Sequence, residues 1–424
     1  MLNPTRRLVI VVRADPVICG HSGEARNLAE AALTRGFDDV RIVTWPIEQL
    51  QRAGLPLKPL ESVLPYSDGI TVERPAPVGD YKVPDGRFLA GMVGRLVELF
   101  TDGVPTVAMS LYLTPHATAI SEALSVARRT GLPVRVTSIA EAVGSDITNV
   151  VRSCVDEGNF GAAAQVFANY LSHNVCVAVS EYTKTLIVEA AEAIDSAQGT
   201  MFANQCQDRV TVSYPAIDSS VFSAITDGDV DRALKNRGLE RGNYVLFLSR
   251  LTKAKGVDDL IEGFCRSEAS TNSKLVIGGT GPDAESFRER ARASSASERI
   301  VFFDDIDDIE KRYLMAGSGA YALASKPRPE FVETFGIALV EKMLAGGGPV
   351  ITTTTGGIPE AVGETALTVG AGSPDSIASA IDQALIHMSP DQLHEFEERA
   401  LAHALQFDRI NVFDRLFDNV LVPS

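Results

Sequence analysis

Hydrophobic residues follow two alternating patterns along this chain. Short runs of aliphatic and β-branched residues alternate with longer segments whose apolar positions recur at helical spacing. Because the short runs are apolar on both faces, they predict buried parallel strands. The expected strands are 8–12, 40–44, 106–111, 134–139, 175–180, 210–214, 244–249, 274–277, 299–303, 320–324 and 350–354.

The segments between these runs predict helices. The expected helices are 24–35, 88–100, 117–130, a helix from 181, 227–242, 257–264, 337–344, 374–387, 390–404 and 408–421. Strands that alternate with helices in this way are typical of doubly wound α/β domains. Residues 50–86 fit this pattern poorly, because proline and glycine are frequent there, and we expect a long, partly irregular insertion.

Composition narrows the class of protein. A chain of 424 residues is long enough for about two domains, and 45% hydrophobic with 22% charged residues is ordinary for a soluble protein. A net charge of −16 argues against nucleic acid and anionic membrane as partners. The five cysteines form no CxxC pair, and no apolar run approaches the ~18 residues of a membrane span. With no signal-peptide pattern at the N-terminus, we expect a cytoplasmic protein without disulfides.

The segment 326–360 holds the densest group of chemical features. Its helical run, 337–344, ends at the glycines and proline of 346–349. The backbone N–H groups at the start of such a helix favour an anion, for example a diphosphate. Glu333 lies just before this start, and Glu341 follows eight positions later inside the helix. An ordinary amphipathic helix with two solvated glutamates is the alternative.

Two basic residues follow an expected strand of the second half. Arg250 comes directly after the strand 244–249, and Lys255 precedes a glycine and the helix 257–264. Two cations beside a helix N-terminus can neutralise a diphosphate leaving group, although surface basic residues would show the same pattern. The glycines of 278–282 lack the spacing of a dinucleotide fingerprint.

Taken together, these motifs resemble those of the family 4 retaining glycosyltransferases. The matching positions are Glu333, Phe335-Gly336, Glu341, the Gly-Gly-Ile-Pro-Glu of 356–360, Arg250 with Lys255-Gly256, the glycine loop 278–282 and the segment 179–222. The resemblance implies the GT-B fold, in which two doubly wound Rossmann-like domains face each other across a cleft. It implies an acceptor-side domain over 1–218, completed by a helix in 406–424, and a domain over 219–405 that binds the nucleotide sugar.

The resemblance also implies a role for individual residues. Glu333 is the expected catalytic residue beside the transferring sugar, and Glu341 is expected to bind the ribose. The expected donor-binding residues are Gly20, Arg250, Lys255, Gly281, Ile306, Phe335, Gly336, Ile337 and Glu341. The family needs no metal or other cofactor, and it retains the anomeric configuration of the sugar.

The chain departs from the family pattern in its first half. Where the family has Gly-Gly, this chain has Cys19-Gly20, and the strand that commonly ends in a histidine places Ile139 in that position. His116 and His21 are the candidates to replace the missing histidine, and we predict a catalytic role for His116. In the second half, carboxylates of the loop 304–308 either bind a guanine base or are simply solvated.

The expected function is therefore transfer of a sugar from a GDP or UDP donor to a small soluble acceptor, in secondary metabolite or antibiotic biosynthesis. A small thiol is an alternative acceptor, because a thiolate needs less help from a base. Two other classes remain open: a nucleotide-sugar isomerase on the same fold, and a two-lobed binding protein without activity. The sequence also leaves open whether the protein forms a homodimer.

Overall fold

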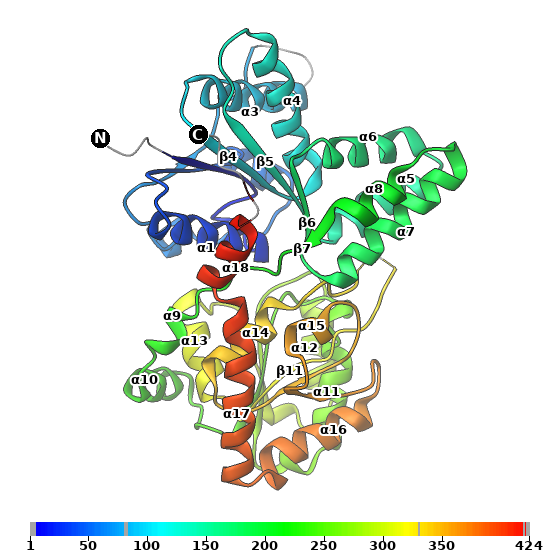
Figure 1. The fold of residues 1–424 in the computed structure, drawn as a ribbon. Coiled ribbons are helices and arrows are strands. Elements are labelled where there is room, and N and C mark those ends of the chain that lie inside the picture. Colours follow the sequence, from blue (N-terminus) through cyan, green and yellow to red (C-terminus); the bar gives the residue numbers. More distant parts are fainter. Residues whose placement is uncertain (1–5, 80–83, 330, 419, 421–424) are drawn as a thin grey trace. The chain divides into compact units, whose positions relative to one another are not determined.

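Two α/β units make up the chain in a computed structural model that describes residues 6–79, 84–329, 331–418 and 420 (Figure 1). The first unit comprises Met1–Ile217 and Arg409–Ser424, and the second comprises Asp218–Asp408. Each unit is built around its own parallel sheet with helices on its faces. The prediction of two doubly wound units is confirmed. No helix within the described ranges has the length and apolar character to span a membrane.

The first unit contains a seven-stranded sheet in the order β3-β2-β1-β4-β5-β6-β7. Its strands are β1 (Arg7–Val11), β2 (Asp39–Val43), β3 (Ile70–Glu73), β4 (Thr106–Leu111), β5 (Val136–Ala142), β6 (Val175–Ala178) and β7 (Val210–Val212). All neighbouring strands pair in parallel. Their carboxyl ends therefore meet at one edge of the sheet, where open α/β sheets bind ligands.

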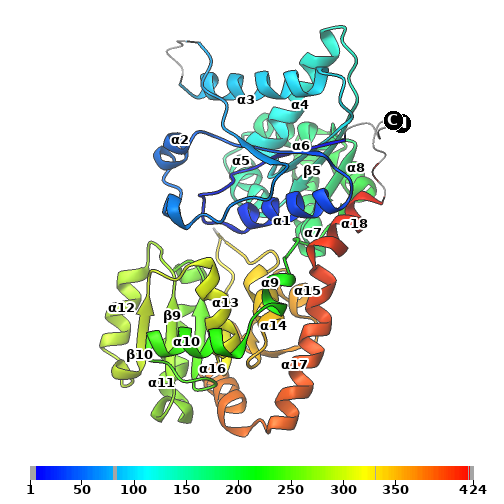
Figure 2. The same ribbon diagram turned by 90° about the vertical axis from the view of Figure 1, so that its left-hand side faces the viewer.

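Helices cover both faces of this sheet, as Figure 2 shows for α1 on one face and α3 and α4 on the other. The helices of this unit are α1 (Gly20–Thr34), α2 (Ile47–Arg52), α3 (Pro84–Thr101), α4 (Thr118–Arg129), α5 (Arg152–Asp156), α6 (Phe160–Leu171), α7 (Glu181–Gln198), α8 (Phe202–Arg209) and α18 (Arg409–Phe417). Successive residues of β1 enter opposite cores: Leu8 packs in the core of α1, and Val9 in that of α3 and α4. This explains why the run at 8–12 is apolar throughout.

The second unit contains a six-stranded sheet in the order β10-β9-β8-β11-β12-β13. Its strands are β8 (Tyr244–Leu248), β9 (Lys274–Gly278), β10 (Ile300–Phe303), β11 (Ala320–Leu323), β12 (Val350–Thr352) and β13 (Ala366–Thr368). Its helices are α9 (Ser220–Ser223), α10 (Asp227–Arg237), α11 (Val257–Arg266), α12 (Ala284–Arg292), α13 (Asp308–Gly317), α14 (Ile337–Ala345), α15 (Ile358–Val362), α16 (Pro374–Asp382) and α17 (Pro390–Ala404). Helix α11 packs on α16, and α14 packs on α13 and α17.

Local signals explain several helix ends. Thr226 caps α10 by accepting a hydrogen bond from the N–H of Asp229, and Gly238 ends this helix in the left-handed conformation. Ser389 and Gln392 form a reciprocal capping box at the start of α17. These polar residues flank apolar periodic segments, which is why the sequence places α17 correctly over 390–404.

The structure corrects several of the expected elements. Helix α10 ends at Arg237, five residues before the expected end at residue 242. Residues 50–86 hold a regular strand, β3, which pairs with β2, although residues 80–83 of this segment lie outside the described part. Strand β5 continues to Ala142 instead of ending at Ile139. Helix α1 begins at Gly20, four residues before the expected start, so the first-turn residues 21–24 are helical.

The C-terminal helix α18 belongs to the first unit and packs on α1. Phe413 and Phe417 stack on each other, and both meet Phe37 edge-on at 5.9 and 5.7 Å between ring centroids. Arg35 forms a bidentate ion pair with Asp414, at 2.6 and 2.7 Å. The structure has this helix end at Phe417, whereas the expected end at Leu421 lies outside the described residues.

Candidate functional site

Arg250 and Lys255 lie on the loop that connects β8 to α11 in the second unit. Arg250 is exposed, whereas the side chain of Lys255 is only 10% exposed. The loop ends in a short 3₁₀ turn over Lys253–Lys255, and Gly256 follows it with φ +71° immediately before α11. The expected strand, basic pair, glycine and helix are therefore all present in this order.

Gly256 is required by a close backbone contact. A Cβ atom at this position would lie 2.0 Å from the carbonyl oxygen of Ala324, which follows β11. The positive φ is a second obstacle to any other residue. The loop that carries Lys255 is thus held against the end of β11 by a contact that only glycine allows.

We expect Gly256→Ala to lower the free energy of unfolding of the second unit by about 3 kcal/mol, because it adds a steric clash to backbone strain. Gly238→Ala is the matched control, since Gly238 also has a positive φ (+63°) but open space around its Cβ position. That control is expected to cost only about 1 kcal/mol. Urea unfolding followed by circular dichroism measures both, and equal losses would contradict the steric account.

Lys255 and Glu333 form an ion pair between the β8–α11 loop and the segment before α14. The pair is largely shielded, since the side chains are 10% and 13% exposed. The Lys255 ammonium also lies 4.8 Å from the centroid of the Phe331 ring, a cation–π contact. Lys255 and Glu333 are 78 positions apart in the sequence, and their motifs predict that they belong to one site. The structure brings them into direct contact.

Two glycines fix the backbone of Glu333. The N–H of Gly357 donates to the carbonyl oxygen of Glu333 at 2.9 Å. A Cβ on Gly356 would lie 2.0 Å from that same oxygen, and one on Gly357 would lie 1.9 Å from the carbonyl oxygen of Thr334. The Gly-Gly of 356–360 thus holds the segment that presents Glu333.

Helix α14 begins at Ile337, directly after Gly336, whose φ of +105° is confined to glycine. Phe335 is buried and meets Phe407 edge-on at 5.0 Å between ring centroids. This packing and the glycine conformation fix the chain at the helix N-terminus, where the sequence predicts an anion site.

Glu341 lies on α14 with its side chain 17% exposed, and it forms an ion pair with Lys311 of α13 at 2.6 Å. Burial alone would lower the pKa of Lys311, but the Glu341 carboxylate outweighs burial and raises it. Sequence reasoning missed Lys311, because no local pattern links two residues on successive helices of the fold.

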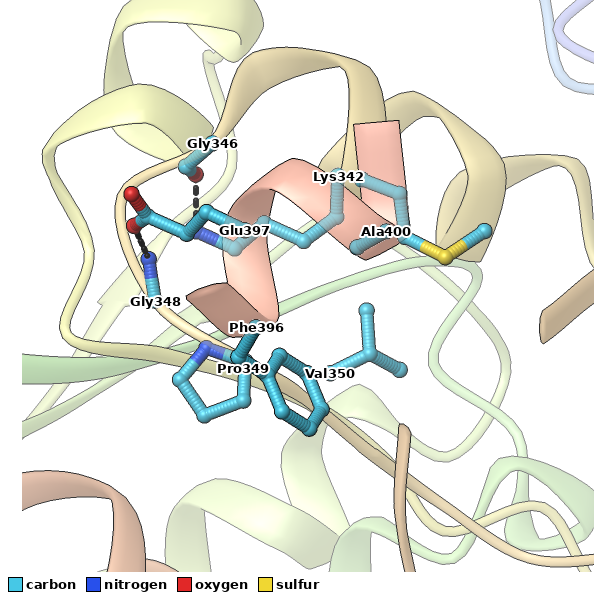
Figure 3. Close-up of a pocket in the computed structure, with 9 residues that line it drawn as sticks. Lys342, Gly346, Gly348, Pro349, Val350, Phe396, Glu397 and Ala400 are labelled. Carbon is cyan, nitrogen blue, oxygen red and sulfur yellow. Dashed lines mark hydrogen bonds between the residues drawn. The ribbon is translucent and has the colours of Figure 1, made fainter. Parts of the chain in front are cut away.

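Lys342, the next residue of α14, anchors the helix from its buried side (Figure 3). Its ammonium donates to the carbonyl oxygens of Met315 and Gly346 and to Oγ of Ser318. Burial lowers the pKa of Lys342 to about 7. The pocket beside it is only about 10 Å³, room for no more than one water, so we assign Lys342 a structural role.

The glycine loop after β9 packs its backbone against the loop of Arg250. A Cβ on Gly279 would lie 2.2 Å from the carbonyl oxygen of Ser249, and one on Gly281 would lie 2.3 Å from that of Leu251. Ile306 is half-buried and packs at the end of β9, where a Cβ on Gly278 would lie 2.6 Å from its Cδ1. Gly281 therefore borders the segment that carries Arg250, and Ile306 borders the end of β9.

The acidic loop 304–308 has partners for its first two carboxylates. Asp304 accepts two bonds from Arg288, at 2.5 and 2.6 Å, and Asp305 accepts one from Arg237 at 2.9 Å. Arg237 lowers the pKa of Asp305. These carboxylates are thus not simply solvated, and a guanine base would have to compete with arginines for them.

The two predicted site residues of the first unit, Gly20 and His116, lie near the carboxyl ends of its strands. Gly20 is the first residue of α1. His116 is 2% exposed and packs against Trp45 and Tyr112, at 4.8 and 5.5 Å between ring centroids. Burial, with smaller contributions from Arg13 and His21, lowers the pKa of His116 well below its usual value. His116 is therefore neutral at pH 7, and its catalytic role stays a prediction.

Another lysine was missed by sequence reasoning. Lys326, after β11, binds Asp258 at 2.9 Å and Asp259 at 2.7 Å in the first turn of α11. This contact ties the segment that leads to Glu333 onto the helix that follows Lys255. Over the described ranges, no group of three or more His, Cys, Asp or Glu side chains is arranged to hold a metal ion.

Comparison with known proteins gives a family match within the second unit. Residues 230–402 match the family model described as "Glycosyl transferases group 1". This range includes every residue that the sequence assigns to donor binding in the second unit, from Arg250 to Glu341.

Two curated relatives match part of the chain. N-acetyl-alpha-D-glucosaminyl L-malate synthase of Bacillus anthracis is 28% identical over 169 residues, which is 39% of this chain and 42% of that protein. D-inositol 3-phosphate glycosyltransferase of Corynebacterium glutamicum is 30% identical over 200 residues, 43% of this chain and 46% of that protein. The chain thus spans less than half the length of these relatives.

Solved structures match the chain over nearly its full length. Anabaena Alr3699/HepE, solved in complex with UDP and glucose, superposes with a TM-score of 0.69 and 16% identity, over 97% of this chain and 98% of that one. WaaG, a glycosyltransferase of lipopolysaccharide biosynthesis, superposes with a TM-score of 0.64 and 16% identity, over 97% and 98%. At this identity the likeness shows the shared fold.

Proposed function

Because this chain carries a group 1 glycosyltransferase domain and has the GT-B fold, we propose that it transfers a sugar from a nucleotide-diphosphate donor to a small soluble acceptor. The donor is a GDP or UDP sugar, held by the second unit, and the acceptor is bound by the first unit. The reaction retains the configuration of the anomeric carbon.

The observation that carries this proposal is the shielded ion pair of Lys255 and Glu333 at the N-terminal side of α14. A departing nucleoside diphosphate gains negative charge on its β-phosphate. A lysine held in a poorly hydrated site stabilises that charge more strongly than one in water. Glu333, held by the same lysine, lies where a carboxylate can meet the sugar attached to that phosphate.

The proposed transfer needs no separate general base, because the leaving group itself takes up the proton of the acceptor. The bond between the anomeric carbon and the β-phosphate oxygen breaks, and the acceptor heteroatom bonds to the anomeric carbon on the same face. The acceptor proton passes to the departing phosphate oxygen. Only charge stabilisation and positioning are required of the protein, in contrast to the carboxylate pairs of glycoside hydrolases.

The remaining predicted residues have roles that fit this arrangement. Exposed Arg250 can reach the diphosphate from the β8–α11 loop, and the amides at the start of α14 bind its oxygens. Glu341 accepts hydrogen bonds from the ribose hydroxyls while it stays paired with Lys311. Two cations and a helix N-terminus supply the charge that a metal would supply, so we propose a metal-independent reaction.

We place the reaction in the biosynthesis of a small secondary metabolite in the cytoplasm. Support comes from the relatives, whose names describe transfer to malate and to inositol phosphate, both small and soluble. The negative net charge of −16 also disfavours a binding surface for anionic lipid.

Calorimetric titration of the full chain with UDP, GDP and ADP, with and without EDTA, tests the donor site. We expect one nucleotide to bind at micromolar Kd or tighter (about −8 kcal/mol) with no effect of EDTA. Absence of binding by all three would refute the proposed function. Loss of binding in EDTA would refute only the proposal that the reaction needs no metal, and the proposed sugar transfer would stand.

A further inference from the structure

Several polar side chains, most of them buried, gather at the carboxyl ends of β1, β4 and β5 in the first unit. The group comprises Arg13, His21, Ser22 and Glu24 from the end of β1 and the first turn of α1, His116 after β4, and Glu141 and Asp146 at the end of β5 and after it. Glu24, Glu141 and Asp146 are 2%, 1% and 0% exposed. Buried carboxyls are rare unless something pairs with them, so each needs an explanation.

Asp146 is explained by the fold. Its two carboxylate oxygens accept hydrogen bonds from four backbone N–H groups at 2.9–3.2 Å. The donors are the N–H groups of Leu113, Val143, Gly144 and Ile147. These bonds tie the loop after β5 to the loop after β4, so Asp146 has a structural role. Burial nevertheless raises the pKa of Asp146.

Glu24 and Glu141 are not explained in this way. Within the described ranges, Oε2 of Glu24 and Oε1 of Glu141 have no hydrogen-bond partner. The other oxygen of Glu24 accepts one long bond, 3.4 Å, from the N–H of Ala216. The fold thus leaves two buried acceptor oxygens unused, which is costly in a protein interior.

The two glutamates are close enough to influence each other. Burial first, and then the charges of Glu24 and Asp146, raise the pKa of Glu141 well above its usual value. Nδ1 of His21 lies 3.9 Å from Oε2 of Glu24, beyond hydrogen-bond distance. The guanidinium of Arg13 lies over the Tyr112 ring, 5.0 Å from its centroid.

Other polar groups in the same place are also unpaired. Among the residues that the structure describes, both ring nitrogens of His116, Nδ1 of His21 and Oγ of Ser22 lack a partner. Arg13 and His21 both act electrostatically on His116, which places the imidazole beside the same group of residues. His116 and Ser22 are each 2% exposed. Unused donors and acceptors from three strand ends point to a ligand that completes them.

We infer that Glu24 and Glu141 recognise a protonated amine on the acceptor, with His116 and Ser22 as further hydrogen-bond partners. This inference rests on the proposed function, because it names the class of acceptor for the first unit. An ammonium has only donors, which match the two unused carboxylate oxygens, and its charge offsets their mutual repulsion. An acceptor bearing a phosphate or carboxylate would face three buried acidic side chains instead.

Binding of an ammonium also acts on the ionisation of Glu141. Burial and the charges of Glu24 and Asp146 raise the pKa of Glu141, and a bound ammonium opposes this shift and favours the ionised form. The titratable groups that act on Glu141 are Glu24 of α1 and Asp146 after β5, and His21 of α1 lies beside both of these. Amine binding should therefore shift Glu141 toward its ionised form and release protons to the buffer.

The test uses the full chain and a pair of probes that differ in one group, glucosamine and glucose. Infrared difference spectra report the protonated-carboxyl band, and calorimetry in two buffers of different ionisation enthalpy reports proton release. We expect glucosamine to remove a carboxyl band that glucose leaves in place, and to bind at least about tenfold more tightly. Equal responses to both probes would overturn the inference.

Three variants assign the effect to the two glutamates. Glu141→Gln should lack the band and the proton release, and Glu24→Gln should reduce the preference for glucosamine to about twofold. Glu73→Gln is the matched control, because Glu73 lies at the end of β3 but is paired with Arg95 at 2.6 Å. It should leave the amine response unchanged, and an equal loss in this control would contradict a specific site. Nucleotide titration of the same preparations separates failure of this inference from failure of the donor site.

Discussion

Replacing Glu333 with glutamine is expected to lower the rate of sugar transfer by about 10²–10³-fold, the usual effect of losing one well-placed electrostatic group. The Kd of the nucleotide should stay within about threefold of the original value. Glutamine keeps the shape of the side chain and can still contact Lys255, but it removes the carboxylate charge beside the sugar. Initial rates at saturating donor and calorimetry with the nucleotide product measure the two effects separately.

Glutamine is a cleaner change than alanine at this position. Glu333→Ala would leave the Lys255 ammonium shielded and without its partner, and breaking such a pair costs roughly 3–5 kcal/mol when it is buried. Nucleotide affinity would then change through Lys255, and the role of Glu333 would be obscured. Glu262→Gln is the control, because Glu262 is an ion-paired glutamate of the same unit, on α11. Full transfer by Glu333→Gln would refute the assigned role.

The sequence predicts the fold well where one residue pattern dominates. Every expected strand is present, because continuous apolar runs such as that of β1 bury both faces of a parallel sheet. The two missed strands lack this signal. Only the first and third residues of β3 are apolar, among prolines and glycines, and β13 is three residues long. Each pairs with one neighbour at an edge of its sheet, so tertiary contacts and not local pattern decide them.

The candidate site shows the same division. Glycines at 256 and 356–357 make close backbone approaches, and Gly336 adopts a positive φ of +105° before α14. Ion pairs such as Lys311 with Glu341 are chosen by the packing of α13 on α14, which no spacing reveals. The predicted end of β5 is wrong in a way that affects the site. The sequence pattern ends this strand at Ile139, whereas the strand continues to Ala142 and so places Glu141 near its carboxyl end.

Removing the two cations of the β8–α11 loop is expected to weaken nucleotide binding itself. Each charge-assisted hydrogen bond contributes about 1.5–3 kcal/mol, so Lys255→Met or Arg250→Met should raise the Kd by about 10–100-fold. Because Lys255 is shielded and Arg250 is exposed, we expect the larger loss from Lys255. Lys253→Met is the matched control, since this exposed lysine lies on the same loop.

Salt distinguishes the contributions of the two cations. The effect of Arg250→Met should shrink as ionic strength rises from 0.05 to about 0.5 M, whereas that of Lys255→Met should persist, because buried pairs are screened less. The double variant Lys255→Met/Glu333→Gln avoids an unpaired buried carboxylate and should bind nucleotide as weakly as Lys255→Met alone. If both single variants bind the nucleotide with unchanged affinity, the β8–α11 loop does not bind the diphosphate. Equal losses in all three, Lys253→Met included, would indicate general attraction to positive charge instead of a built site.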